Sequence, residues 1–271
     1  MFLILFKLFS ILPLFLLKGF STLFAQCLII FNLSPYIITK KNINHCGFKD
    51  KSLPKDSIKM TAETFLEYPY LWGNPENYNK LLEHNKECHQ ISKSDRPSLI
   101  FTLHMGCVDV MLFHTSKNVP DLNIIYTPAK NKNFDNAVKN IRQSTEAKLH
   151  PANVQGMKEL YKNYLNGENV IVACDLVPHQ KGTYSKLFNK PCFSIDLIEK
   201  LSKKDTHDLH FVFLTRGKNK KYKFNLETIN RPISTDEMNI FFEKAISKAP
   251  DLYGWEYKKF RKLQGEVKNI Y

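Results

Sequence analysis

From Ser98 onward the chain alternates between short apolar runs typical of buried strands and amphipathic segments typical of helices. Repeated alternation of this kind predicts an α/β fold with a central, mostly parallel sheet flanked by helices. We assign residues 98–271 to this domain, and the hydrophobic fraction of 43% is large enough to build its core. The expected strands are 98–103, 122–128, 147–151, 169–176, 208–216 and 221–229, and the expected helices are 108–116, 133–144, 153–167, 193–204 and 234–250.

Residues 1–39 have the composition of a membrane anchor, because Lys7 and Lys18 are their only charged side chains. The uncharged run from Gly19 to Thr39 is about as long as the ~20 apolar residues of a spanning helix, although Pro35 should end a helix near Ser34. Two interpretations stay open: a single spanning helix, or a helix in one leaflet with both lysines reaching the headgroups. A cleaved signal peptide fits less well, because the apolar stretch is long and no small-residue cleavage site stands out.

Residues 40–97 are expected to form a helical connector between the anchor and the α/β domain. Polar residues dominate 40–60, and a helix is predicted from Ser57 to about Tyr68, where Pro69 should interrupt it. A second short helix is expected to begin with Asn74 as N-cap and Pro75 in the first helical position.

The chain is strongly basic, with 39 Lys and Arg against 26 Asp and Glu and a formal net charge of +13. Such a surplus favours a polyanionic partner: nucleic acid, anionic lipid headgroups or a phosphorylated substrate. No nucleic-acid-binding motif is recognisable, and the apolar N-terminus argues against that partner. The cysteines are scattered without a CxxC pair, so neither a disulfide scaffold nor a metal site is expected; they are Cys27, Cys46, Cys88, Cys107, Cys174 and Cys192.

The segment LIFTLHMGCVDVMLF (99–113) places polar groups at an expected strand-to-helix junction, where active sites of such sheets collect. If the strand ends at His104 and the helix begins near Cys107, Asp109 lies in the first helical turn. Its carboxylate could then fix the imidazole tautomer and leave the other nitrogen as a general base. Gly106 would allow close approach of another molecule, and the helix amides could face an oxyanion.

This combination suits acyl transfer to a hydroxyl group without a covalent enzyme intermediate. The alternative is a structural histidine at the strand end and an unrelated helical aspartate, because the H-x4-D spacing often arises by chance.

Five segments, in order along the chain, resemble blocks of the bacterial lipid A biosynthesis (late) acyltransferase family. TLHMGCVDV resembles the family's T-x-H-x-G-x-x-E block, and YGWEYKKFRK its closing Tyr-x-Trp-x-His-Arg-Arg-Phe-Lys. The other three are KNINHCGFKD after the anchor, IIYTPAKNKNFDNAVKNIRQ with its downstream Arg, and VIVACDLVPHQKGTYSKLFNKPCF with the strand and Asp. The resemblance covers most of the chain and implies a glycerolipid-acyltransferase-like fold.

The resemblance implies an enzyme of the bacterial inner membrane with its catalytic domain on the cytoplasmic side. It would need no cofactor, and would move an acyl chain from acyl carrier protein or acyl-CoA to a hydroxyl of a lipid A precursor or related phosphoglycolipid. His104 and Asp109 would be catalytic and Gly106 would contact substrate. Arg142 matches the family's Arg and could hold an acceptor phosphate, or it could be a solvated helix residue. Asp175 could orient the acceptor sugar or a basic partner, or cap a helix.

The chain also departs from the family pattern. Asp109 stands where Glu is usual, and Asp at this spacing is usual in glycerolipid acyltransferases, so a glycerol phosphate or lysophospholipid acceptor is an alternative. Thr127 replaces an Arg, and Leu176 replaces a Gln, which motivates a second alternative: a catalytically inactive, membrane-associated lipid-binding homologue. The closing segment carries aromatic and basic residues that favour interfacial membrane contact.

Overall fold

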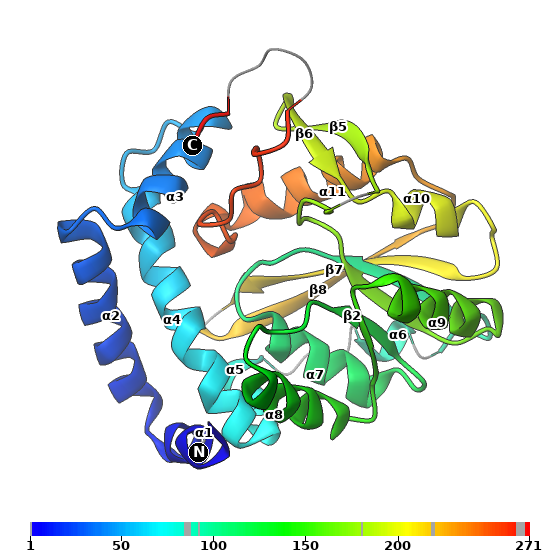
Figure 1. The fold of residues 1–271 in the computed structure, drawn as a ribbon, viewed down its shortest axis with the longest axis horizontal. Coiled ribbons are helices and arrows are strands. Elements are labelled where there is room, and N and C mark those ends of the chain that lie inside the picture. Colours follow the sequence, from blue (N-terminus) through cyan, green and yellow to red (C-terminus); the bar gives the residue numbers. More distant parts are fainter. Residues whose placement is uncertain (1, 84–87, 92, 180, 218–219, 264–268) are drawn as a thin grey trace.

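The computed structural model describes residues 2–83, 88–91, 93–179, 181–217, 220–263 and 269–271, and it has the expected α/β architecture (Figure 1). A six-stranded sheet has the order β3-β2-β4-β1-β7-β8, in which only β8 runs antiparallel to its neighbour. The prediction of a mostly parallel sheet is therefore confirmed. The strands are β1 (Ser98–Thr102), β2 (Asn123–Tyr126), β3 (Lys148–Pro151), β4 (Val170–Ala173), β7 (Asp208–Arg216) and β8 (Tyr222–Ile229).

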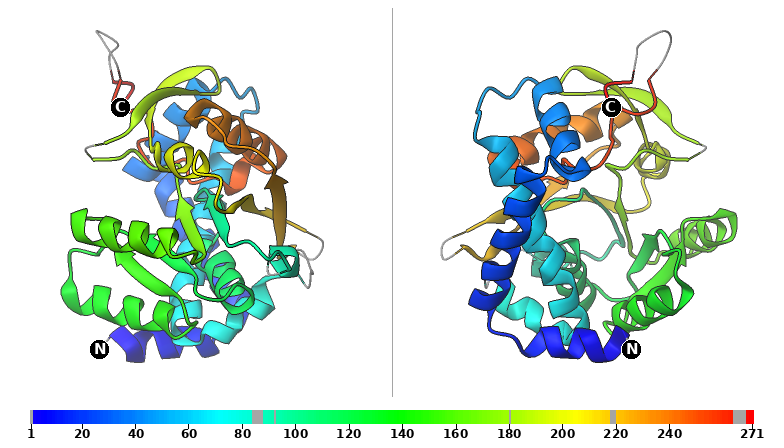
Figure 2. Two further views of the ribbon diagram at one scale, coloured as in Figure 1. Left: turned by 90° about the vertical axis from the view of Figure 1, so that its right-hand side faces the viewer. Right: turned by 60° about the vertical axis from the view of Figure 1, so that its left-hand side comes forward.

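Helices cover both faces of this sheet (Figure 2). α7 and α8 lie on the face that the N-terminal helices also cover, and α9, α10 and α11 lie on the other. Their bounds are α7 (Val108–Asn118), α8 (Lys132–Gln143), α9 (Val154–Leu165), α10 (Leu197–Ser202) and α11 (Thr235–Lys248). The core between α11 and the sheet is aromatic: the Phe101 and Phe211 rings stack 4.9 Å apart and pack against Phe242.

The helix predicted over 193–204 is shorter than expected, because its first residues belong to a hairpin that the sequence did not reveal. β5 (Thr183–Leu187) pairs antiparallel with β6 (Lys190–Ser194), and Phe193 is therefore in a strand. The turn consists of Phe188 and Asn189, both with positive φ. Turns of this kind usually carry glycine, so the Phe-Asn pair gave no hairpin signal.

The described part of the N-terminal region is largely helical, and helices are also what we expected of the connector over 40–97. Pro69, predicted to interrupt a helix near Tyr68, lies inside α4 instead. The long helix continues because α1 and α2 pack along it, and tertiary packing overrides the cost of one missing backbone donor. The elements are α1 (Phe2–Ile11), α2 (Leu14–Ile30), α3 (Ser34–His45), α4 (Leu53–Gly73), η1 (Pro75–Asn77), α5 (Tyr78–Leu81) and α6 (Cys88–Ile91).

Of the two interpretations of the N-terminus, a single spanning helix over 19–39 is not observed, because α2 ends at Ile30 and α3 starts at Ser34. Within the described residues no single helix is both long and apolar enough to cross a membrane. α1 and α2 together meet that length and composition criterion, but they are bent by 113° at the intervening break. Both expose many large apolar side chains: Leu3, Ile4, Leu5, Leu8, Ile11, Phe15, Leu16, Phe20, Leu23, Phe24 and Ile30.

Candidate active site

The register of two neighbouring strands places a histidine and an aspartate side by side. β1 pairs in parallel with β4, and Thr102 lies opposite Ala173 at the carboxyl ends of both strands. His104 and Asp175 each follow two residues later. Nδ1 of His104 lies 2.7 Å from Oδ1 of Asp175. The Asp175 side chain is 4% exposed, whereas that of His104 is 38% exposed and can meet a ligand.

The charges of this pair stabilise each other. Burial raises the pKa of Asp175, but the neighbouring imidazole and Lys259 outweigh burial and hold that pKa below its ordinary value. Burial lowers the pKa of His104, but the attraction and hydrogen bond of Asp175 outweigh it and raise the pKa above the ordinary value. An ionised Asp175 can only accept a hydrogen bond, so Nδ1 carries the proton and Nε2 is the basic nitrogen.

Asp109 does not orient His104 in this structure, which corrects the pairing expected from the H-x4-D spacing. The Asp109 side chain is fully buried, and Oδ1 forms a 2.9 Å ion pair with Nη2 of Arg142. Nε of Arg142 and the indole nitrogen of Trp72 also donate to this carboxylate, at 3.1 and 2.6 Å. The first turn of α7 thus directs Asp109 toward α8 and α4, whereas the partner of His104 comes from the neighbouring strand.

Arg142 is consequently not a solvated helix residue. Its side chain is 22% exposed. Burial lowers its pKa, but the charge and hydrogen bonds of Asp109 outweigh burial, so the pKa is raised and the guanidinium stays charged. Arg142 is also close enough to His104 for its charge to oppose protonation of the imidazole.

The Asp109–Arg142 pair predicts a large effect on stability. Arg142→Met should lower the free energy of unfolding by about 3–5 kcal/mol, because it leaves a buried carboxylate without its counter-ion. Chemical denaturation of the purified protein in detergent measures this loss. In the matched double variant Asp109→Leu/Arg142→Met the uncompensated charge is absent, so most of the stability should return. Equal stability of Arg142→Met and the wild type would contradict the buried pair.

The backbone amides beside His104 are already hydrogen-bonded, which corrects the expectation of an oxyanion site there. Gly106 N–H donates to the Leu252 carbonyl at 2.8 Å, and Cys107 N–H to the Tyr222 hydroxyl at 3.1 Å. The close approach at Gly106, which has φ +66°, is made by the same chain: a Cβ there would lie 2.5 Å from Cε1 of Tyr222. A glycine at this position therefore leaves room for the Tyr222 ring.

The closing segment of the chain packs against the site around His104. Met105 and Tyr253 form an antiparallel bridge, and Gly254 N–H donates to the His104 carbonyl at 3.0 Å. The interfacial membrane contact expected of Trp255 and Phe260 is contradicted, because Trp255 is 1% exposed and Phe260 is fully buried.

Two charged residues of this segment lie near the histidine–aspartate pair and were not recognised as site residues. Lys259, 2% exposed, donates to the Ser194 hydroxyl at 3.3 Å and lowers the pKa of Asp175. Glu256 accepts from the Thr61 hydroxyl at 3.1 Å, and burial raises its pKa. Both lie in the closing block YGWEYKKFRK, but their proximity to His104 and Asp175 depends on contacts between distant parts of the chain.

The structure thus defines an α/β protein with a histidine–aspartate pair at the carboxyl edge of a parallel sheet, the edge at which ligands of such sheets usually bind. The model of the bacterial lipid A biosynthesis acyltransferase family matches residues 1–262, so the chain belongs to that family. No curated protein matches the chain significantly. The family membership supports an acyl-transferring enzyme.

Proposed function

We propose that the protein transfers a fatty acyl chain from acyl carrier protein or acyl-CoA to a hydroxyl of a lipid A precursor or related phosphoglycolipid. The observation that carries this proposal is the pairing of His104 with Asp175, because it supplies an oriented base at the strand edge of an acyltransferase-family protein. Asp175 replaces Asp109 as the orienting carboxylate.

The reaction would proceed by direct attack on the donor thioester. Nε2 of His104 removes the proton of the acceptor hydroxyl while the hydroxyl oxygen attacks the thioester carbonyl carbon. This attack forms the ester C–O bond and gives a tetrahedral intermediate with an oxyanion. The intermediate collapses when the carbonyl double bond re-forms and the C–S bond is cleaved. The imidazolium then protonates the departing thiolate, so His104 returns to its neutral state, and Asp175 stabilises the transient positive charge.

Arg142 is the candidate for stabilising the oxyanion of that intermediate, because the Gly106 and Cys107 amides are occupied. Its Nε and Nη2 atoms face Asp109, and Nη1, which has no partner among the described residues, is left as a donor for a ligand. A cation fixed by a buried carboxylate keeps its orientation during the reaction, which favours stabilisation of a developing negative charge. The same group could hold an acceptor phosphate instead.

The proposed location is the bacterial inner membrane, with α1 and α2 lying in one leaflet. Their exposed apolar side chains and the 113° bend support an in-plane arrangement over a crossing one. Lys18 pairs with Glu63 of α4 at 3.4 Å, which ties α2 to the body of the protein. The lysines that follow the apolar N-terminus favour the cytoplasmic side; they are Lys40, Lys41, Lys49 and Lys51.

Mass spectrometry of lipids from cells with and without the gene tests this function. Deletion should produce lipid A lacking one acyl chain, and expression of the wild-type chain should restore the missing mass. A change confined to phospholipid masses would instead favour a glycerolipid acceptor, for which the H-x4-D spacing is the supporting feature. Unchanged lipids of both kinds would contradict the enzymatic proposal and favour a binding protein.

A further inference from the structure

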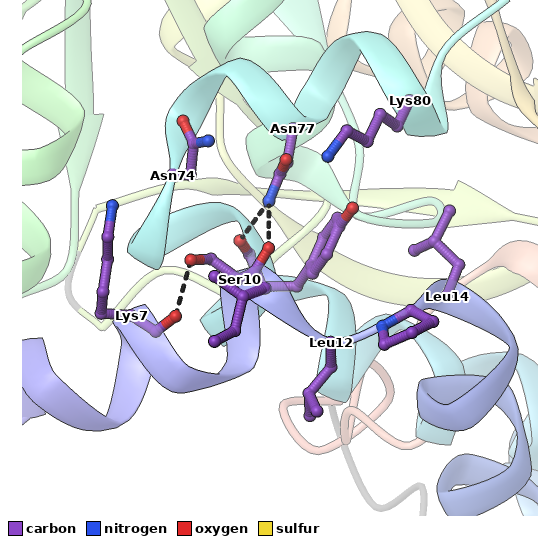
Figure 3. A pocket seen from close by; sticks show the side chains of 10 residues that line it. Lys7, Ser10, Leu12, Leu14, Asn74, Asn77 and Lys80 are labelled. Carbon is purple, nitrogen blue, oxygen red and sulfur yellow. Dashed lines mark hydrogen bonds between the residues drawn. The ribbon is translucent and has the colours of Figure 1, made fainter.

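A cavity of about 570 Å³ lies where the turn between α1 and α2 meets the end of α4, η1 and α5 (Figure 3). Lys7 of α1 and Lys80 of α5 stand on opposite sides of it, with Asn74 and Asn77 between them. None of its lining residues belongs to the site around His104. The cavity is therefore a separate feature of the molecule.

The polar groups of this cavity are suited to an anion. Its lining contains two lysines and no acidic residue. Within the described part of the chain neither lysine forms an ion pair, and Lys80 lies 6.0 Å from the centre of the Tyr70 ring. Asn74 accepts from the Glu76 amide through its carbonyl oxygen, so its NH₂ group is left to donate. Two ammonium groups and an amide donor suit a phosphate group.

The surroundings of the cavity indicate that this phosphate belongs to a lipid. The adjoining faces of α1 and α2 are apolar and open: Leu8 is 56% exposed, Ile11 69% and Phe15 71%. A free phosphate ion has no apolar part to contact these side chains, whereas the acyl chains of a lipid would pack along them.

α1 also packs against the body of the protein. The Phe6 ring packs 5.1 Å from Trp72, whose indole nitrogen donates to Asp109. The cavity shares no lining residue with the site around His104 and Arg142, which argues against the acceptor substrate as the occupant.

We propose that this cavity binds the phosphate headgroup of an anionic phospholipid of the bilayer, with Lys7 and Lys80 as its two cationic contacts and the acyl chains beside α1 and α2. Such a lipid would fix the bend between the two helices and the depth of the protein in the membrane. The inference is independent of the reaction, and its test does not involve acyl transfer.

Flotation of the purified full-length chain with vesicles tests the proposal. One set of vesicles contains phosphatidylcholine alone, and a second contains phosphatidylcholine with phosphatidylglycerol. The wild type should bind the second set more tightly than the first. The affinity of Lys7→Gln/Lys80→Gln for the second set should be roughly 10- to 30-fold lower than that of the wild type, as expected for two lysines near an anionic surface. Binding to phosphatidylcholine alone should change little, because the apolar faces are intact.

The matched control is Lys158→Gln/Lys162→Gln, which removes two exposed lysines from α9 and lowers the net charge equally. This variant should keep the preference for phosphatidylglycerol. Equal losses in the two double variants would contradict the proposal, because general charge attraction would then explain binding. The same flotation with lipid A in place of phosphatidylglycerol, and with added inorganic phosphate, identifies the occupant. A loss seen only with lipid A vesicles, or displacement by inorganic phosphate, would also contradict the proposal, since the occupant would then be the acceptor or a free ion.

Discussion

Replacing His104 by alanine is expected to lower the kcat of acyl transfer by about 10²- to 10⁴-fold, the range usually attributed to a positioned general base. The acceptor hydroxyl would have no group within reach to take its proton, and the leaving thiolate would lose its proton donor. Initial rates with an acyl-carrier-protein donor and a lipid A precursor measure the loss.

The same substitution should leave the fold intact. His104 is 38% exposed and lies outside the aromatic core, so circular dichroism and the thermal midpoint should match those of the wild type. Wild-type rates in His104→Ala would contradict the assignment of the base. If His104→Ala lost both rate and fold, His104→Gln would separate the two effects. It keeps the polarity and most of the volume of the side chain, so it should fold and be equally inactive.

Replacing Asp175 by asparagine should lower kcat by about 10³- to 10⁴-fold, the scale seen when a catalytic histidine loses its orienting carboxylate. Asparagine keeps the shape of the buried side chain, but it can donate to Nδ1 and so favour the unproductive tautomer. It also removes the negative charge that stabilises the imidazolium during the reaction.

This prediction distinguishes orientation from substrate binding. Loss of orientation should lower kcat and leave KM nearly unchanged. If Asp175 instead bound the acceptor sugar, as its position at a strand end alone would allow, Asp175→Asn should chiefly raise the KM for the acceptor. A raised KM with wild-type kcat would contradict the role assigned here.

The sequence identified the junction at His104 because that feature is local. An apolar strand, a polar residue and a helix in close succession are visible without any knowledge of the tertiary fold. The same holds for β4, whose apolar run ends just before Asp175. The polar residues at the ends of both strands were therefore found correctly.

Their pairing was missed because it depends on strand order. β1 and β4 are neighbours although two strands and three helices separate them in the chain, and only their shared register brings His104 to Asp175. The sequence offered Asp109 as the nearer carboxylate, but a residue in the first turn of α7 faces α4 and α8. Its partners Trp72 and Arg142 lie far away in sequence.

In the N-terminal half, the differences between the predicted and the observed helices also result from tertiary contacts. Pro69 normally ends a helix, yet α4 continues because α1 and α2 pack against it. The division between α2 and α3 follows from the break before Pro35, which the sequence did signal, but the bend between α1 and α2 depends on tertiary contacts with α4.

The central claim is that Asp175 orients the base His104 and raises its pKa. The pH dependence of kcat/KM in the wild type and in Asp175→Asn tests this claim. The rate should rise with pH as the imidazole loses its proton, and kcat/KM reports this pKa in the free enzyme. Asp175 raises the pKa of His104 above the ordinary value of 6.5, so the wild-type midpoint should lie above 6.5. In Asp175→Asn burial acts without the carboxylate, and the midpoint should fall below that of the wild type. An identical midpoint in both proteins would contradict the account.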